Sequence, residues 1–139
     1  MSAPGFLING LNAAAKQIHA VFDSIATDHW DRRATSEAMT PLESIRHLAH
    51  CYTAFMSEAR GQSWDWRAPF DLGVTEPEDI LAKANELRAQ AVDMVKSSTD
   101  ETIYEKAINY ILLHDAYHVG QMALFRMQTD PTWDPHSLY

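Results

Sequence analysis

Apolar residues recur every three or four positions along four stretches of the chain, which is the period of helices with one buried face. The pattern predicts helices over residues 4–28, 41–60, 77–97 and 101–128. The third helix has the plainest stripe, formed by Ile80, Leu81, Ala84, Leu87, Ala91, Met94 and Val95. The first repeats it with Phe6, Leu7, Leu11, Ala14, Ile18, Val21, Phe22 and Ile25. No alternating run or tight hairpin turn predicts a strand, so the expected fold class is all-α.

Three helix starts carry a capping box, in which a hydroxyl side chain at the N-cap is followed three residues later by an acidic one. The boxes begin at Thr40, Thr75 and Ser98. Two of them also place a proline inside the first turn, which suits a helix start. We therefore expect three well-defined helix starts, with these residues as caps.

Linker lengths constrain the order of the helices. Only a few residues separate the third helix from the fourth, so these two run antiparallel. The connection over residues 61–75 is longer. About 15 extended residues reach about 50 Å, which is enough to return along a helix of about 30 Å. The second and third helices then run parallel, and we expect one domain over residues 1–139, an up-down-down-up four-helix bundle.

Composition and charge narrow the partners. The 139 residues carry a formal net charge of −8, which argues against nucleic acid and against an anionic membrane surface. No apolar run approaches the ~20 residues of a membrane span, and no signal peptide is apparent. The only cysteine, Cys51, has no partner for an internal disulfide, so we expect a cytoplasmic protein.

The candidate chemistry lies in the fourth helix, where His114 and His118 are one turn apart inside an apolar run. If residues 103–127 form one regular helix, His118 lies about 40° from His114. Within about 100° of His114 lie Ile103, Ala107, Tyr110, Ile111, Tyr117, Met122, Leu124 and Phe125. Two inward imidazoles need a partner, since an unpaired buried polar group is costly. A divalent metal is the simplest one. Asp115 stands where zinc proteases have Glu and points about 100° away, so that mechanism is not indicated.

A third ligand is expected from the second helix, because open zinc sites use three protein ligands and a water. This helix offers His47, His50 and Cys51. His47 lies about 9 Å from the start of its helix and His118 about 14 Å from the end of the fourth, depths that match in antiparallel helices. The helical wheel places His47 nearly opposite the centre of the apolar stripe. Spacing alone leaves His47 and His50 both open.

The stretch Glu43-Ser-Ile-Arg-His47-Leu48 and the element His114-x-x-x-His118-x-Gly120-Gln121 together resemble the DinB/YfiT-like superfamily, and the resemblance covers essentially the whole chain. It implies an up-down-down-up bundle, commonly a homodimer, with a three-histidine divalent metal site open to solvent. The implied ligands are His47, His114 and His118. The implied chemistries are hydrolysis of small amide- or ester-like substrates and transfer of a low-molecular-weight thiol to an electrophile.

Two classes of function follow from these observations. The first is a metal-dependent hydrolase or thiol transferase with zinc or nickel as the expected ion. No general base stands out, so the nucleophile would depend on the metal for activation. The second is a non-catalytic, metal-stabilised interaction module acting through a dimer face. A fourth protein ligand such as Cys51 or His136 would favour the second.

Several side chains are expected beside the site. Trp30, Trp133 and His136 are expected at its mouth. Tyr110 is a candidate hydrogen-bond donor, and Gln121 a candidate for orienting a ligand.

Overall fold

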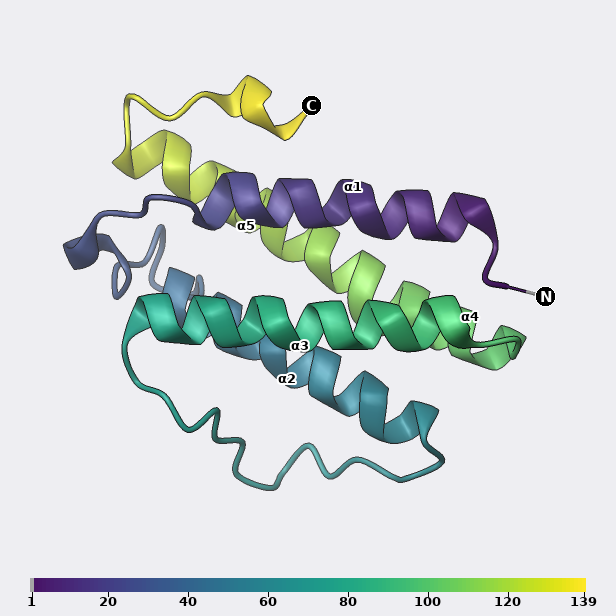
Figure 1. Ribbon diagram of the computed structural model, residues 1–139. Helices are drawn as coiled ribbons and strands as arrows, with labels where there is room; N and C mark the ends of the chain where they lie inside the picture. The colour runs from purple at the N-terminus through teal and green to yellow at the C-terminus, as the bar shows by residue number, and fades with distance from the viewer. Residues whose placement is uncertain (1) are drawn as a thin grey trace.

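Four helical segments lie side by side in the computed structural model, which describes residues 2–139 (Figure 1). The first three are α1 (Gly5–Phe22), α2 (Pro41–Ala59) and α3 (Pro77–Ser97). The fourth consists of α4 (Glu101–Ala107), a π-helical turn η2 (Ile108–Leu112) and α5 (Leu113–Thr129). Short 3₁₀ turns occur as η1 (Thr27–His29) and η3 (Pro135–Leu138). Residues 2–139 contain no strand, which confirms the all-α prediction.

The helices follow the expected order. In Figure 1, α2 and α3 run in one direction, and α1 and the α4–α5 segment run in the other. The connection between α2 and α3 travels back along the bundle, as its length predicted. The bundle is therefore up-down-down-up, and α2 faces an antiparallel α5. Within the described part, no helix has the length and apolar character needed to cross a membrane.

The helix ends differ from prediction at several points. Helix α1 stops at Phe22 because Asp23 is extended and Ser24 has a φ of +56°, so the predicted extension to residue 28 is wrong. Phe6 is 79% exposed and does not belong to the buried stripe. Thr40 caps α2 as expected, since its hydroxyl accepts from the Glu43 N–H at 3.1 Å. Thr75 does not cap α3, whose N-cap residue makes no side-chain bond. Nor is Ser98 the cap of α4.

The cap of α4 is Asp100, whose carboxylate accepts from the Thr102 N–H at 2.9 Å. The Ser98 hydroxyl accepts instead from the N–H of Asp100, which lies two residues before Thr102. A carboxylate at this position also suits the positive end of the helix dipole.

A buried polar network ties all four helical segments together. Asp115 on α5 is fully buried and forms an ion pair of 2.8 Å with Arg88 on α3. The Tyr52 hydroxyl on α2 donates to the same carboxylate. Arg88 also donates to the Leu11 carbonyl of α1 at 2.7 Å. Burial raises the pKa of the Asp115 carboxyl, while the charge of Arg88 and the bond from Tyr52 act in the opposite direction. Around this network packs an apolar core that includes Leu11, Phe22, Ile45, Leu48, Phe55, Ile80, Val95, Ile111 and Met122.

The π-helical turn η2 changes which residues of the last helix face inward. Ala107, Ile111, Asp115 and Val119 are all buried at a spacing of four, which a regular helix at about 100° per residue would not keep on one line. The predicted uninterrupted helix is therefore wrong at this turn. Tyr117 and Leu124, which were expected inside, are 63% and 50% exposed. Asp115 takes the inward position instead.

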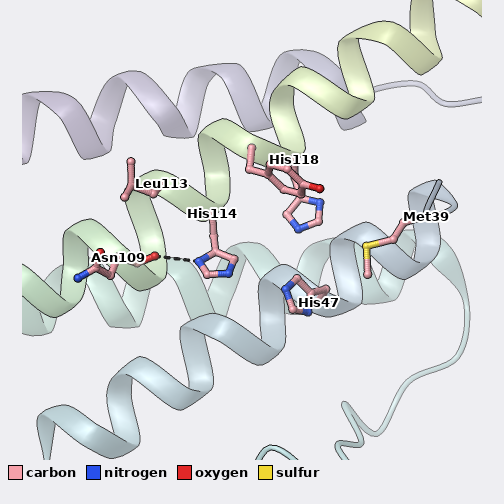
Figure 2. A pocket seen from close by; sticks show the side chains of 7 residues that line it. Met39, His47, Asn109, Leu113, His114 and His118 are labelled. Atoms are coloured by element: carbon pink, nitrogen blue, oxygen red, sulfur yellow. Dashed lines mark hydrogen bonds between the residues drawn. The ribbon is translucent and has the colours of Figure 1, made fainter. Parts of the chain in front are cut away.

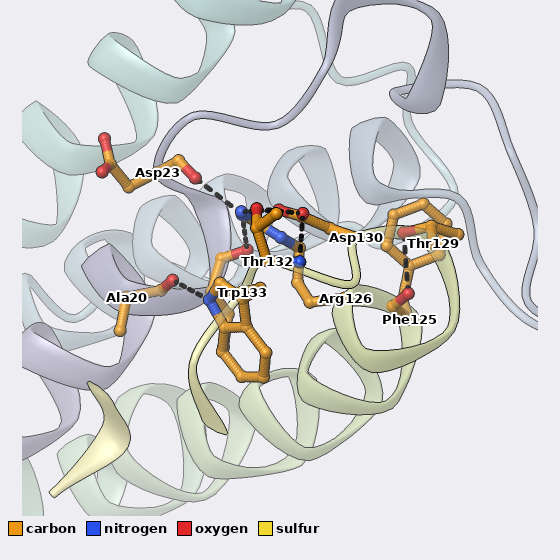
Figure 3. Close-up of polar contacts among 9 residues, drawn as sticks. Ala20, Asp23, Phe125, Arg126, Thr129, Asp130, Thr132 and Trp133 are labelled. Carbon is orange, nitrogen blue, oxygen red and sulfur yellow. Dashed lines mark hydrogen bonds and ion pairs between the residues drawn. The ribbon is translucent and has the colours of Figure 1, made fainter. Parts of the chain in front are cut away.

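The C-terminal tail, residues 130–139, is held against α1 by polar contacts (Figure 3). The Arg126 guanidinium donates to the Asp23 carbonyl at 2.6 Å and pairs with Asp130 at 3.1 Å. The Trp133 indole N–H donates to the Ala20 carbonyl at 3.0 Å. Arg126 also lies over the Trp133 ring, 5.8 Å from its centroid. These contacts hold the C-terminal residues beside α1.

Candidate metal centre

Three histidines approach one another between α2 and α5 (Figure 2). The His47 ring on α2 lies 5.6 Å from the His114 ring and 5.3 Å from the His118 ring, measured between centroids. The antiparallel pairing of the two helices places them at the same depth, as expected from the positions of His47 and His118 along their helices. His47 is thus the histidine of α2 that faces α5.

The π-helical turn orients His114. Its Nδ1 lies 2.8 Å from the backbone carbonyl oxygen of Asn109, five residues earlier. A carbonyl only accepts, so Nδ1 carries the proton and Nε2 keeps its lone pair. In Figure 2 the ring extends toward His47. Metal-binding histidines commonly have this arrangement, in which the non-ligating nitrogen donates to a fixed acceptor.

His118 is 1% exposed, and its Nδ1 has no hydrogen-bond partner. The side-chain oxygen of Gln121, one turn further along α5, is also buried and unpaired. The Gln121 amide donates to the Tyr117 hydroxyl at 3.1 Å, and the Tyr117 ring packs edge-on against His118. An unpaired buried imidazole costs stability unless something else binds it. Coordination through Nε2 would fix the proton on Nδ1, beside the unpaired Gln121 oxygen.

Burial and mutual repulsion favour the neutral form of His47 and His118. Burial lowers the pKa of His118 to about 4, and the charges of His47 and His114 contribute further. Burial also lowers the pKa of His47, with smaller contributions from His114 and His50. Neutral imidazole is the form that binds metal ions. His47 and His118 are therefore in the protonation state that binds a cation at neutral pH.

Cys51 lies at the inner side of the same cluster. Its Sγ is 3.6 Å from His47 Nε2, and the thiol is fully buried. Burial, and then the negative charge of Asp115, raises the pKa of this thiol to about 12. Donor atoms of His47, Cys51 and His114 all lie within 4.8 Å of one another. This is the one compact donor set found among the described residues, and His118 faces it from the next turn of α5.

A hollow of about 460 Å³ opens onto the histidines. It is lined by Met39, His47, Asn109, Leu113, His114, Tyr117 and His118. The residues expected at its mouth are not there. Trp30 is buried and stacks on Phe22 at 6.4 Å, while Trp133 and His136 belong to the tail beside α1. That expectation fails because the tail folds back onto α1 rather than over α5.

Contacts also account for Tyr110 and His50, the other candidates beside the site. The Tyr110 hydroxyl donates to Glu58 at 3.1 Å, so it is not directed to the histidines. His50, which spacing left open as a ligand, is partly buried because the α2–α3 connection covers it. The Trp64 indole N–H donates to His50 Nε2 at 3.0 Å, and Phe70 stacks on the ring at 4.3 Å. His50 is thereby occupied away from the hollow.

The chain matches the model of a known protein family. The model of the DinB superfamily matches residues 11–122. The chain belongs to the DinB superfamily. The matched segment contains His47, His114 and His118 as well as Cys51 and Gln121. No curated protein and no solved structure matches the chain. The family and the His/Cys cluster together support a metal-binding site in this DinB bundle.

Sequence reasoning missed two contributors to the candidate site. One is the Asn109 carbonyl in the π-helical turn η2, whose oxygen lies 2.8 Å from His114 Nδ1. The other is Asp115, which anchors α5 against Arg88 between the two histidines. A signal for the second was present, since Arg88 stands between Ala84 and Ala91 on the apolar stripe of α3. A charged residue on such a stripe indicates a buried partner.

Proposed function

We propose that this DinB protein is a metal-dependent enzyme whose divalent ion, zinc or nickel, is bound by His47, His114 and His118. The proposed activity is hydrolysis of a small amide- or ester-like substrate, or transfer of a low-molecular-weight thiol. The observation that carries the proposal is the convergence of three imidazoles: the His47 ring lies 5.6 Å from the His114 ring and 5.3 Å from the His118 ring across the bundle.

The residues of the hollow fit this proposal. A divalent ion held by neutral imidazoles supplies Lewis-acid activation of a carbonyl or of a water or thiol nucleophile. The Asn109 carbonyl holds His114 in one orientation. Met39, Leu113 and Tyr117 form an apolar wall at the opening, which suits the apolar part of a small substrate. No carboxylate is among the described residues that line the hollow, so no side chain there is placed as a general base.

The test is the metal content of purified protein after removal of metal and reloading with zinc or nickel. Wild type is expected to hold one ion per chain. His47→Ala, His114→Ala and His118→Ala are expected to lose it, while His50→Ala is the matched control on α2 and is expected to keep it. Panels of thiol–electrophile pairs and of esters and amides, assayed with and without metal, then separate the two reactions. A wild type without stoichiometric metal would refute the proposal.

A second candidate function, an interaction module, is favoured by an apolar stripe on the outer side of α5. Leu113, Tyr117, Leu124 and Met127 are all at least half exposed, and an added Cβ at Gly120 would meet nothing within 4 Å. With Gly120 counted among them, these positions are spaced by four and three residues in turn, which is the spacing of a helix–helix seam. We propose that two copies pair through this stripe as a symmetric homodimer. Sedimentation should give twice the mass of the chain, and Leu124→Glu should halve it. A monomeric wild type would refute the pairing.

A further inference from the structure

A thiol and an imidazole are arranged as a pair on α2. Cys51 follows His47 by one turn, and Sγ lies 3.6 Å from His47 Nε2. The His114 donor completes a set within 4.8 Å. The three donor atoms, two from α2 and one from α5, therefore lie close together. Cys51 is therefore part of a cluster rather than an isolated buried cysteine.

The distance between these two atoms fits a shared ion. Zinc–thiolate bonds are about 2.3 Å long and zinc–imidazole bonds about 2.0–2.1 Å. At a tetrahedral angle these bonds place sulfur and nitrogen about 3.6 Å apart. The observed separation has this value without any movement of α2.

His118 lies beside this set. It is 1% exposed, and its ring lies 5.3 Å from that of His47. It also stands one turn from His114, as Cys51 stands one turn from His47. Each of the two facing helices thus carries two possible donors at a spacing of four. Of these four residues, only His47, Cys51 and His114 have donor atoms within 4.8 Å of one another, and His118 lies outside that set.

We propose that the Cys51 thiolate is a ligand of the ion, so that the centre is a mixed histidine–cysteine site. This inference rests on the metal site proposed above and extends its ligand set. A thiolate favours thiophilic ions such as zinc over harder ones. Added to the three histidines, Cys51 is a fourth protein ligand, which favours the non-catalytic, metal-stabilised module over the enzyme.

The test uses cobalt(II) in the full chain, because thiolate ligation gives it an intense near-ultraviolet charge-transfer band that imidazole does not. Cys51 is the only cysteine, so no other thiolate contributes. Wild type is expected to show the band at one cobalt per chain. Cys51→Ala is expected to lose it while retaining the visible bands of histidine-bound cobalt. Met39→Leu removes the sulfur that lines the hollow and is the matched control, expected to keep the band.

The outcomes separate the two proposals. Cobalt bound by wild type without the band overturns Cys51 ligation and leaves the three-histidine site standing. A wild type that binds no cobalt, zinc or nickel overturns both. A band that persists in Cys51→Ala also overturns Cys51 ligation. If Cys51→Ala fails to fold, zinc absorption spectroscopy of wild type decides. Sulfur at about 2.3 Å beside nitrogen at about 2.0–2.1 Å supports the proposal, and nitrogen and oxygen alone refute it.

Discussion

The ion pair between Arg88 and Asp115 yields the most demanding prediction about stability. Replacing Asp115 by leucine, which has nearly the same shape, leaves the Arg88 guanidinium buried opposite an apolar group. An arginine does not escape by losing its proton. Breaking a buried pair in this way costs about 3–5 kcal/mol, a large part of the about 5–15 kcal/mol that stabilises a typical domain. The Tyr52 hydroxyl also loses its acceptor.

Arg88→Met removes the other partner of the same ion pair. It should lower the free energy of unfolding by less than Asp115→Leu does, because Asp115 can take up a proton. Burial already raises the pKa of that carboxyl, and loss of Arg88 raises it further. The folded state then binds a proton that the unfolded state releases, so the stability of Arg88→Met should fall as pH rises above the ordinary carboxyl range. Urea unfolding followed by tryptophan fluorescence, on metal-free protein, measures both variants and their combination. If Asp115→Leu costs under about 1 kcal/mol, or if Arg88→Met costs more than Asp115→Leu, the reasoning is wrong.

Three further predictions follow from particular contacts. Thr40→Ala should lower the free energy of unfolding by about 1 kcal/mol, because α2 loses its cap. Thr75→Ala should leave the free energy of unfolding unchanged. Equal effects of the two variants in urea unfolding would contradict the cap assignment. Because burial holds the pKa of His118 near 4 in the folded state, metal-free protein should lose about 3 kcal/mol as pH falls from about 6.5 to 4, since the unfolded chain binds the proton first. His118→Leu should flatten this slope, and an unchanged slope would exclude His118 as its source. Deleting Asn109 should convert η2 into an ordinary helical turn without loss of helix content. Zinc binding should weaken about 10- to 100-fold, because His114 loses its carbonyl partner. If titration calorimetry shows wild-type affinity for zinc, the Asn109 carbonyl does not orient His114.

The helices and their order were predicted correctly from the sequence, but several helix ends were not. Amphipathic periods and the length of the connection after α2 depend on simple geometry, and both agree with the structure. Which residue caps a helix depends on competition between neighbouring polar side chains for the same backbone N–H groups. Ser98 and Asp100 both offer oxygens near the start of α4, and the carboxylate caps the helix. The choice between His47 and His50 depends on the connection that covers His50, a tertiary contact that spacing does not reveal.

The π-helical turn explains most of what sequence reasoning missed in the site. Regular geometry directs Tyr117 and Leu124 inward and Asp115 aside, and one extra residue in the turn rotates all later side chains by about 100°. Nothing in residues 108–112 alone favours this turn over a regular one. The rotation is selected from outside the helix, because only then does Asp115 meet Arg88 on α3. The same rotation brings His114 Nδ1 to the Asn109 carbonyl and keeps His118 opposite His47. A buried charge on α3 therefore determines how α5 presents its histidines, and the ion pair and the candidate metal centre form one structural unit.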